Sequence, residues 1–128
     1  MKYMLMVYFD EASLSDPDRE ACYVKSVQLT HDLKREGRYN IAAPLHSVTT
    51  ATSVRSRNGR RLVTDGPFAE TREQLGGFYI VDVEDLDAAV EIAERIPMVD
   101  RGTIEIRPVV HLDGLPESSL MHAEQSTK

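Results

Sequence analysis

The dipeptide Asn58-Gly59 constrains the fold more than any other short stretch of this chain. Asn-Gly between two extended runs is typical of a type I′ β-turn, in which both turn residues take positive φ angles. A two-residue turn also sets the register of its strands, so we predict that Val54 lies opposite Val63. The middle of the chain is therefore expected to form a β-hairpin. Its two strands are expected at residues 51–57 and 60–65.

Two helices and four further strands are predicted around this hairpin. The first helix has Ser15 or Asp16 as its cap and Pro17 in its first turn, and Gly37 is suited to end it. In the second helix, apolar residues recur with helical spacing from Leu86 onwards. Helices are expected at 17–36 and 86–96, and the further strands at 3–9, 38–45, 78–83 and 103–110.

The order of these elements predicts an α+β fold with both helices on one face of an antiparallel sheet. Without the inserted hairpin, the order is the ferredoxin-like βαββαβ. Strands 3–9 and 78–83 are apolar on both faces, so neither face of the sheet is suited to water. The first helix also has a wider apolar face than one sheet contact needs. We therefore expect two copies to pack sheet against sheet as a homodimer.

The composition limits the classes of partner. With 128 residues, of which 41% are hydrophobic and 28% charged, the chain is expected to form one packed domain. Its net charge of −6 argues against nucleic acid and anionic membranes as partners. The single cysteine, Cys22, is expected in the core, and a chain without disulfides fits a reducing compartment. The apolar N-terminal run is too short to span a bilayer and lacks a signal-peptide cleavage site, so we expect a cytoplasmic protein.

The domain is expected to comprise residues 1–112, followed by a polar tail at 113–128. Polar residues predominate after Asp113, and such an end is expected to fray. Three apolar residues in the tail could instead dock on a partner. They are Leu115, Leu120 and Met121.

The stretch Thr-Asp-Gly-Pro-Phe-Ala-Glu-Thr at 64–71 follows the hairpin. Its Gly-Pro pair predicts a sharp, stiff turn, and carboxylates flank this turn at Asp65 and Glu70. Two interpretations stay open. In the structural one, Phe68 fills the core and Asp65 caps the turn through backbone N–H groups. In the functional one, the stretch forms the edge of a pocket. The pair Gly76-Gly77, shortly after it, predicts a β-bulge or a close backbone approach.

This stretch and the Glu-Gln-Leu-Gly-Gly-Phe-Tyr at 73–79 strongly resemble the YCII-related proteins of the DGPF type. Thr-Ala-Thr-Ser-Val-Arg at 50–55 and Glu-Ile-Arg-Pro-Val at 105–109 look like the same family. The resemblance covers about residues 2–110. It implies a ferredoxin-like fold and a dimeric α+β barrel, without implying a particular reaction.

The resemblance also bears on function. Many relatives are bacterial and are encoded near extracytoplasmic-function sigma factors, which hints at regulation. The wider YCII group is suspected of enzymatic activity through a His–Asp pair whose histidine lies on the first helix. Carried over to this chain, the histidine would be His31, and Asp65 matches the DGPF motif directly.

Near the Gly-Pro turn, the residues suited to chemistry are carboxylates and a histidine. If the turn folds Asp65 and Glu70 into one cleft, crowding and desolvation would raise a carboxyl pKa, and His46 could join them. The alternative is that Asp65 caps the turn and His46 is exposed. No helix-spaced histidine pair supports a metal site, and we expect no metal and no cofactor. Such a metal site would combine His31, His46, Asp65 and Glu70.

Four arginines lie on the predicted hairpin. They could grip a phosphate or an acidic partner. The alternative is a solvated tip whose charges discourage pairing with other strand edges. They are Arg55, Arg57, Arg60 and Arg61.

We therefore predict a small cytoplasmic homodimer with a cleft for a small molecule near Asp65. Acid–base activity there would use Asp65, Glu70, His46 and His31. The alternative is a non-catalytic regulatory or scaffold module linked to sigma-factor-associated transcription control. The first hypothesis predicts a pocket in which these side chains converge, and the second predicts a filled core there and an exposed recognition surface.

Overall fold

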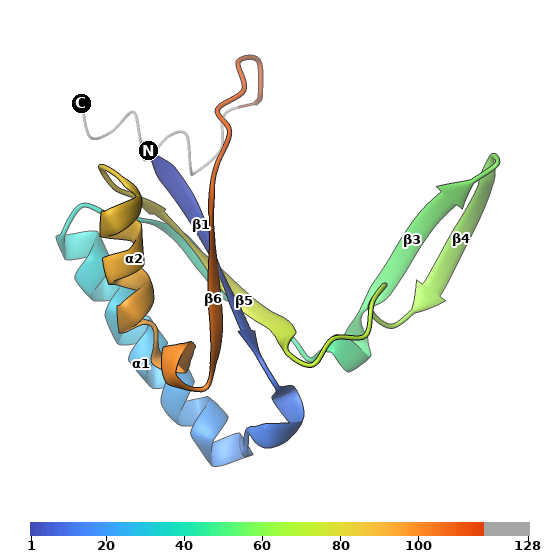
Figure 1. Cartoon of the computed structure of the whole chain (residues 1–128), viewed down its shortest axis with the longest axis horizontal. Helices are drawn as coiled ribbons and strands as arrows, with labels where there is room; N and C mark the ends of the chain where they lie inside the picture. Colours follow the sequence, from blue (N-terminus) through green and yellow to red (C-terminus); the bar gives the residue numbers. More distant parts are fainter. Residues whose placement is uncertain (117–128) are drawn as a thin grey trace.

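The computed structural model describes residues 1–116, in which two helices lie on one face of a sheet and a hairpin projects from the other side (Figure 1). One-turn 3-10 helices that the sequence did not predict occupy Glu11–Ser13, Val48–Thr50 and Pro97–Asp100. The strands are β1 (Lys2–Phe9), β2 (Tyr39–Pro44), β3 (Thr52–Arg57), β4 (Arg60–Asp65), β5 (Gln74–Asp82) and β6 (Gly102–Pro108), and the helices are α1 (Asp16–Arg35) and α2 (Leu86–Arg95).

The main sheet has the strand order β2-β5-β1-β6, and every neighbouring pair runs antiparallel. This arrangement confirms the predicted ferredoxin-like α+β fold with an inserted hairpin. Most element bounds agree with the prediction to within one or two residues. The largest difference is at β5, which begins at Gln74 rather than at Phe78, because Gln74 and Leu75 still pair with β1 ahead of the two glycines.

The start and end of α1 follow from its sequence. The Ser15 hydroxyl oxygen accepts a hydrogen bond from the backbone N–H of Asp18 at 3.2 Å, and Pro17 lies in the first turn. Gly37 follows the helix with φ +73°, a conformation that side chains disfavour, and this ends the helix. The predicted cap and the predicted stop are both confirmed.

The core lies between the helices and the sheet. Leu5 and Val81 of the sheet and Leu33 and Ile92 of the helices are fully buried there. Burial of side chains of this size stabilises the fold by about 1.5–3 kcal/mol each. Helix α1 buries only Leu29 and Leu33, although its sequence predicted a wider apolar face. The apolar residues of α1 that stay exposed lie outside this core.

The second face of the sheet has no helix over it (Figure 1). Met4 and Met6 alternate with the core residues of β1, and their cross-strand neighbours on β5 are Ile80 and Phe78. Strand β2 continues the same apolar surface beside β5. We call this surface the open face, and it comprises Met4, Met6, Tyr8, Ile41, Ala43, Phe78 and Ile80.

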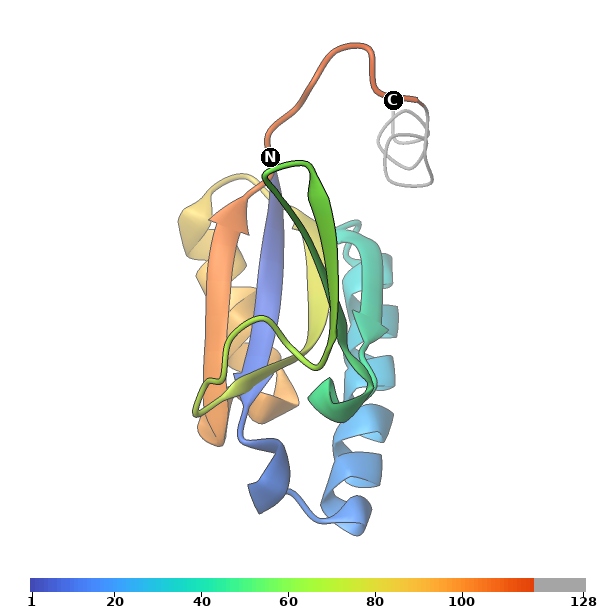
Figure 2. The same cartoon turned by 90° about the vertical axis from the view of Figure 1, so that its right-hand side faces the viewer.

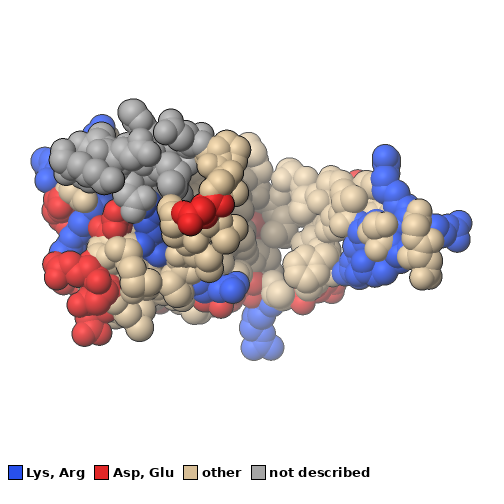
Figure 3. All heavy atoms as spheres, turned by 90° about the horizontal axis from the view of Figure 1, so that it is seen from above, with Lys and Arg blue, Asp and Glu red and all other residues tan. Residues whose placement is uncertain are grey.

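The β3–β4 hairpin projects on the side of the open face as an arm, defined as Thr52–Asp65 (Figure 2). Its register is the predicted one, with Val54 opposite Val63. Asn58 and Gly59 have φ angles of 53° and 73°, both positive, as a type I′ turn requires. Arginine side chains gather at the tip of the arm (Figure 3). The hairpin is therefore confirmed in type and register, and it stands away from the body of the molecule.

Most of the predicted tail lies outside the described residues, and so do Leu120 and Met121, two of the three residues named as able to dock on a partner. Residues 113–116 are exposed, and Leu115 is exposed at 56%. Within residues 1–116, no helix combines the length and apolarity needed to cross a membrane.

Candidate functional site

The paired glycines make the start of β5 irregular. The register between β1 and β5 shifts after Val7, and this leaves Gly76 as an extra residue, which is a β-bulge. A Cβ atom on Gly76 would collide with the ring of Phe9, and one on Gly77 would crowd the backbone of β2. Both predicted consequences of the glycine pair, the bulge and the close approach, are confirmed.

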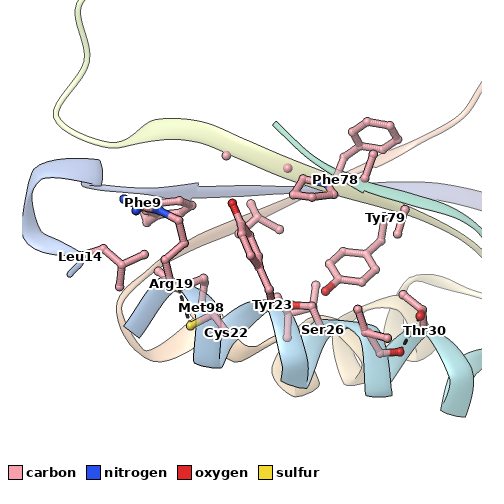
Figure 4. Close-up of a pocket in the computed structure, with 18 of the residues that line it drawn as sticks. Phe9, Leu14, Arg19, Cys22, Tyr23, Ser26, Thr30, Phe78, Tyr79 and Met98 are labelled. Carbon is pink, nitrogen blue, oxygen red and sulfur yellow. Dashed lines mark hydrogen bonds between the residues drawn. The ribbon is translucent and has the colours of Figure 1, made fainter. Parts of the chain in front are cut away.

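A cavity of about 250 Å³ lies between α1 and the sheet, beside this bulge (Figure 4). Tyr23 and Val27 of α1 line it and are exposed at 38% and 57%, so they lie at its mouth. Most of the wall is apolar. The lining residues are Val7, Phe9, Leu14, Arg19, Cys22, Tyr23, Ser26, Val27, Thr30, Tyr39, Ala42, Ala43, Pro44, Gly76, Gly77, Phe78, Tyr79, Ile96 and Met98.

Tyr79 is the most deeply buried hydroxyl-bearing residue of this lining, with an exposed fraction of 5%. It reaches from β5 towards Ser26 on α1 (Figure 4). Burial raises the pKa of the Tyr79 phenol above its ordinary value of 10.0, and a hydrogen bond with Ser26 acts in the opposite direction. The phenol is therefore neutral at physiological pH, and it offers the cavity a dipole rather than a charge.

Tyr23 is the second phenol of the cavity. Its ring stands between α1 and the sheet with the hydroxyl towards the strands (Figure 4), and this hydroxyl has no hydrogen-bond partner among residues 1–116. A polar atom of a bound molecule could take that place. Behind it, the Cys22 thiol contacts the Met98 sulfur at 3.5 Å, so Cys22 is half-buried and forms part of the wall rather than the centre of the core.

Arg19 brings a positive charge to the lining. It extends from α1 towards Phe9 (Figure 4) and pairs with Asp16, with 2.7 Å between nitrogen and oxygen. The Asp16 side chain is 92% exposed, so water competes for this ion pair and makes it weak. An acidic group on a bound molecule could therefore replace Asp16 as the partner of Arg19.

The four predicted site residues do not line this cavity. Asp65 ends β4, Glu70 lies in the loop before β5, His46 follows β2, and His31 is on α1. All four side chains are exposed, and none makes a hydrogen bond or ion pair within the described part of the chain. Within one subunit these four side chains therefore lie apart from the cavity, and their acid–base role stays a prediction. Over the same residues, no group of three or more His, Cys, Asp or Glu is arranged to hold a metal ion.

The Gly-Pro turn is held by other groups than the Asp65 side chain. The Gly66 N–H donates to the Ala51 carbonyl at 2.7 Å, and the Ser53 hydroxyl donates to the Gly66 carbonyl at 2.8 Å. Phe68 is 79% exposed. The structural interpretation, in which Asp65 caps the turn and Phe68 fills the core of its own chain, is therefore wrong.

Sequence reasoning expected a pocket beside Asp65 and did not assemble the cavity under α1. Two of its observations pointed there. The first helix carried more apolar side chains than one sheet contact needs, among them Tyr23 and Val27. The pair Gly76-Gly77 indicated a β-bulge or a close backbone approach just ahead of a predicted strand. These two features come together only through the way α1 packs on the sheet.

Comparison with known proteins identifies relatives of the whole domain. Residues 1–113 match the model of the YCII-related domain, which includes every residue of the cavity. An uncharacterised protein of Rhizobium meliloti (strain 1021) is 34% identical over 116 residues, and the alignment spans 85% of this chain and 92% of that protein. The chain therefore belongs to the YCII-related family.

Proposed function

We propose that this protein binds a small, largely apolar molecule in the cavity under α1, and that it does so as a cytoplasmic homodimer. The cavity is the observation that carries the proposal. Its volume of about 250 Å³ is close to the lower end of the range for ligand sites, about 300–1,000 Å³. Ligand sites combine apolar walls with a few polar groups that orient the ligand, and this cavity has that composition.

The polar groups of the lining define the class of ligand. An apolar ring or short chain would lie between α1 and the two glycines of the bulge. One polar atom would receive a hydrogen bond from Tyr23, and an acidic group at the mouth would pair with Arg19. We therefore propose a small aromatic or aliphatic acid as the ligand.

Acid–base catalysis is a separate proposal, because the four exposed candidates do not converge within one chain. It would require another subunit or a bound ligand to bring them to one reacting group. Loss of turnover in an Asp65→Asn variant that still binds ligand would support it. Binding is the function that the geometry supports better.

The proposed homodimer rests on the open face. It carries seven apolar or aromatic residues, and a second copy packed against it would cover those that one chain leaves exposed, as in the dimeric α+β barrel that the family resemblance implies. Specific interfaces bury about 1,200–2,000 Å² in total, and a four-stranded sheet together with the arm offers a surface suited to this size. The exposed arm also favours the alternative function, a regulatory or scaffold module that acts through a recognition surface.

Ligand-observed NMR with indole, phenol and benzoate tests the binding proposal. We expect saturation transfer to at least one of these probes, and stronger transfer to benzoate than to phenol because of Arg19. A Ser26→Leu variant, which fills the cavity, should abolish the transfer. Lys25→Leu places the same side chain on the exposed, non-lining side of α1 and should leave the transfer unchanged. Absence of transfer in the wild type, or an equal effect of the two substitutions, contradicts the proposal.

A further inference from the structure

We propose that the arm clasps a second copy of this chain, with its apolar residues and Phe68 packed on that copy and its arginines facing that copy's carboxylates. This inference rests on the proposed homodimer and adds a second contact to it. The open face alone would give two sheets in contact, whereas the arm would hold the two subunits together from outside the sheets.

The first support is the exposure of apolar side chains in a hairpin whose two strands pair regularly. Val54 and Val63 form a cross-strand pair, yet they are exposed at 67% and 50%. Leu62 on the other side of the hairpin is exposed at 47%, and Phe68 beyond its base at 79%. Within residues 1–116, β3 and β4 hydrogen-bond only to each other as strands. An isolated two-stranded hairpin is marginally stable in water, so an outside partner is needed to explain its regularity.

The second support is the position and length of the arm. It rises on the side of the open face (Figures 1 and 2), so a copy seated on that face has to lie beside it. Each strand of the arm has 6 residues. At about 3.3 Å per residue, the arm extends roughly 20 Å, while two packed sheets lie only about 10 Å apart. The arm is therefore long enough to pass the edge of the second sheet and reach the helical layer behind it.

The third support is charge complementarity. The arm carries four arginines and one carboxylate, in a chain whose net charge is −6. Arg57 lies directly opposite Arg60, an arrangement of like charges that destabilises a hairpin unless carboxylates lie nearby. None of the four arginines forms an ion pair with a residue of 1–116, and positive charge gathers at the tip (Figure 3). The acidic body of a second copy supplies the missing carboxylates.

The charge pattern also separates a second copy from other occupants. A general acidic ligand, such as nucleic acid, would use the arginines and leave the apolar pair exposed. A purely apolar surface would cover the valines but would offer no carboxylates to the arginines. A second copy of this chain offers exposed apolar side chains in its helical layer, such as Val24 and Val27 of α1, and an acidic body at the same time, which matches both parts of the arm.

Sedimentation velocity on the full chain tests the inference. We expect a dimer at about 100 μM, well above the micromolar dissociation constants of weak complexes. Replacing all four arm arginines by glutamate should raise the dimer dissociation constant at least about tenfold at low salt. Replacing the same four by lysine keeps the charge and should change it by less than about threefold. Phe68→Ser should also weaken the dimer.

Two open-face variants, Met6→Glu and Ile41→Glu, separate this inference from the homodimer on which it rests. If the wild type is monomeric, the proposed homodimer fails and the arm proposal fails with it. If either open-face variant breaks the dimer while the glutamate and Phe68 variants of the arm dimerise like the wild type, the homodimer stands and the arm proposal is overturned. If the glutamate and Phe68 variants weaken the dimer while the lysine variant dimerises like the wild type, the arm proposal is supported.

Discussion

The body and the arm of this protein are equally regular in backbone structure, but only the body buries its apolar side chains within the chain. Leu33 and Ile92 in the body are fully buried, whereas Val54 and Val63 in the arm are exposed by half or more of their surface. The arm nevertheless has the register that its turn dictates. Turn chemistry therefore sets the register of the arm, and the difference in burial is the reason for our proposal that another molecule covers it.

Truncating one side chain in each region tests the difference in burial between body and arm most directly. In a Met6→Glu background, where we expect a monomer, Leu33→Ala should lower the free energy of unfolding by about 2–5 kcal/mol, because it leaves a cavity in the core. Val54→Ala in the same background should lower it by less than about 0.5 kcal/mol, as expected for an exposed site. Urea unfolding followed by circular dichroism measures both. Similar losses from the two substitutions would mean that the arm is packed on its own body.

A smaller effect distinguishes the charges of the two regions. In the body, Arg95 forms a two-pronged contact with Glu36, at 2.8 and 3.0 Å, and this hydrogen bonding lowers the pKa of the Glu36 carboxyl below its ordinary value of 4.5. A lowered folded-state pKa contributes stability above the unfolded pKa and loses it as the pH falls through the folded pKa. Both side chains are about one-third exposed, so the contribution is below about 1 kcal/mol.

The measurement compares the wild type with Glu36→Gln in urea at pH 7 and at about pH 3. The wild type should be the more stable at pH 7, and the two proteins should converge at the acidic end. Replacing Arg57 by glutamine in the monomeric background should produce no such pH-dependent difference, because Arg57 has no carboxylate partner within residues 1–116. A stability difference that persists at acidic pH would show that Glu36 acts through packing rather than through its charge.

Much of the fold could be predicted from local patterns. Asn58-Gly59 predicted the hairpin with its register, Ser15 and Gly37 predicted the ends of α1, and the glycine pair before β5 predicted the bulge. Each of these predictions depends on backbone chemistry within a few residues. The order of elements then left the ferredoxin-like arrangement as the simplest sheet with both helices on one face.

The cavity could not be predicted in the same way, because its wall joins α1 to residues of β5 that are distant in sequence. The interpretation that placed Phe68 in the core was wrong, since the sequence of a loop suggests burial of an aromatic residue without showing which molecule buries it. Asp65 illustrates the same limit. Its place at the end of β4 was predictable from the turn, whereas its lack of a hydrogen-bond partner depends on how Ser53 and Ala51 hold Gly66 instead.

Amide hydrogen exchange, compared between the wild type and Met6→Glu, tests the contrast between body and arm most directly. We predict that amides of β1 and β5 are protected in both proteins, since their hydrogen bonds belong to the body. We also predict that amides of the arm are protected in the wild type and exchange freely in Met6→Glu, which we expect to be a monomer. Equal protection of the arm in both proteins, or free exchange of the arm in the wild type, would contradict this prediction.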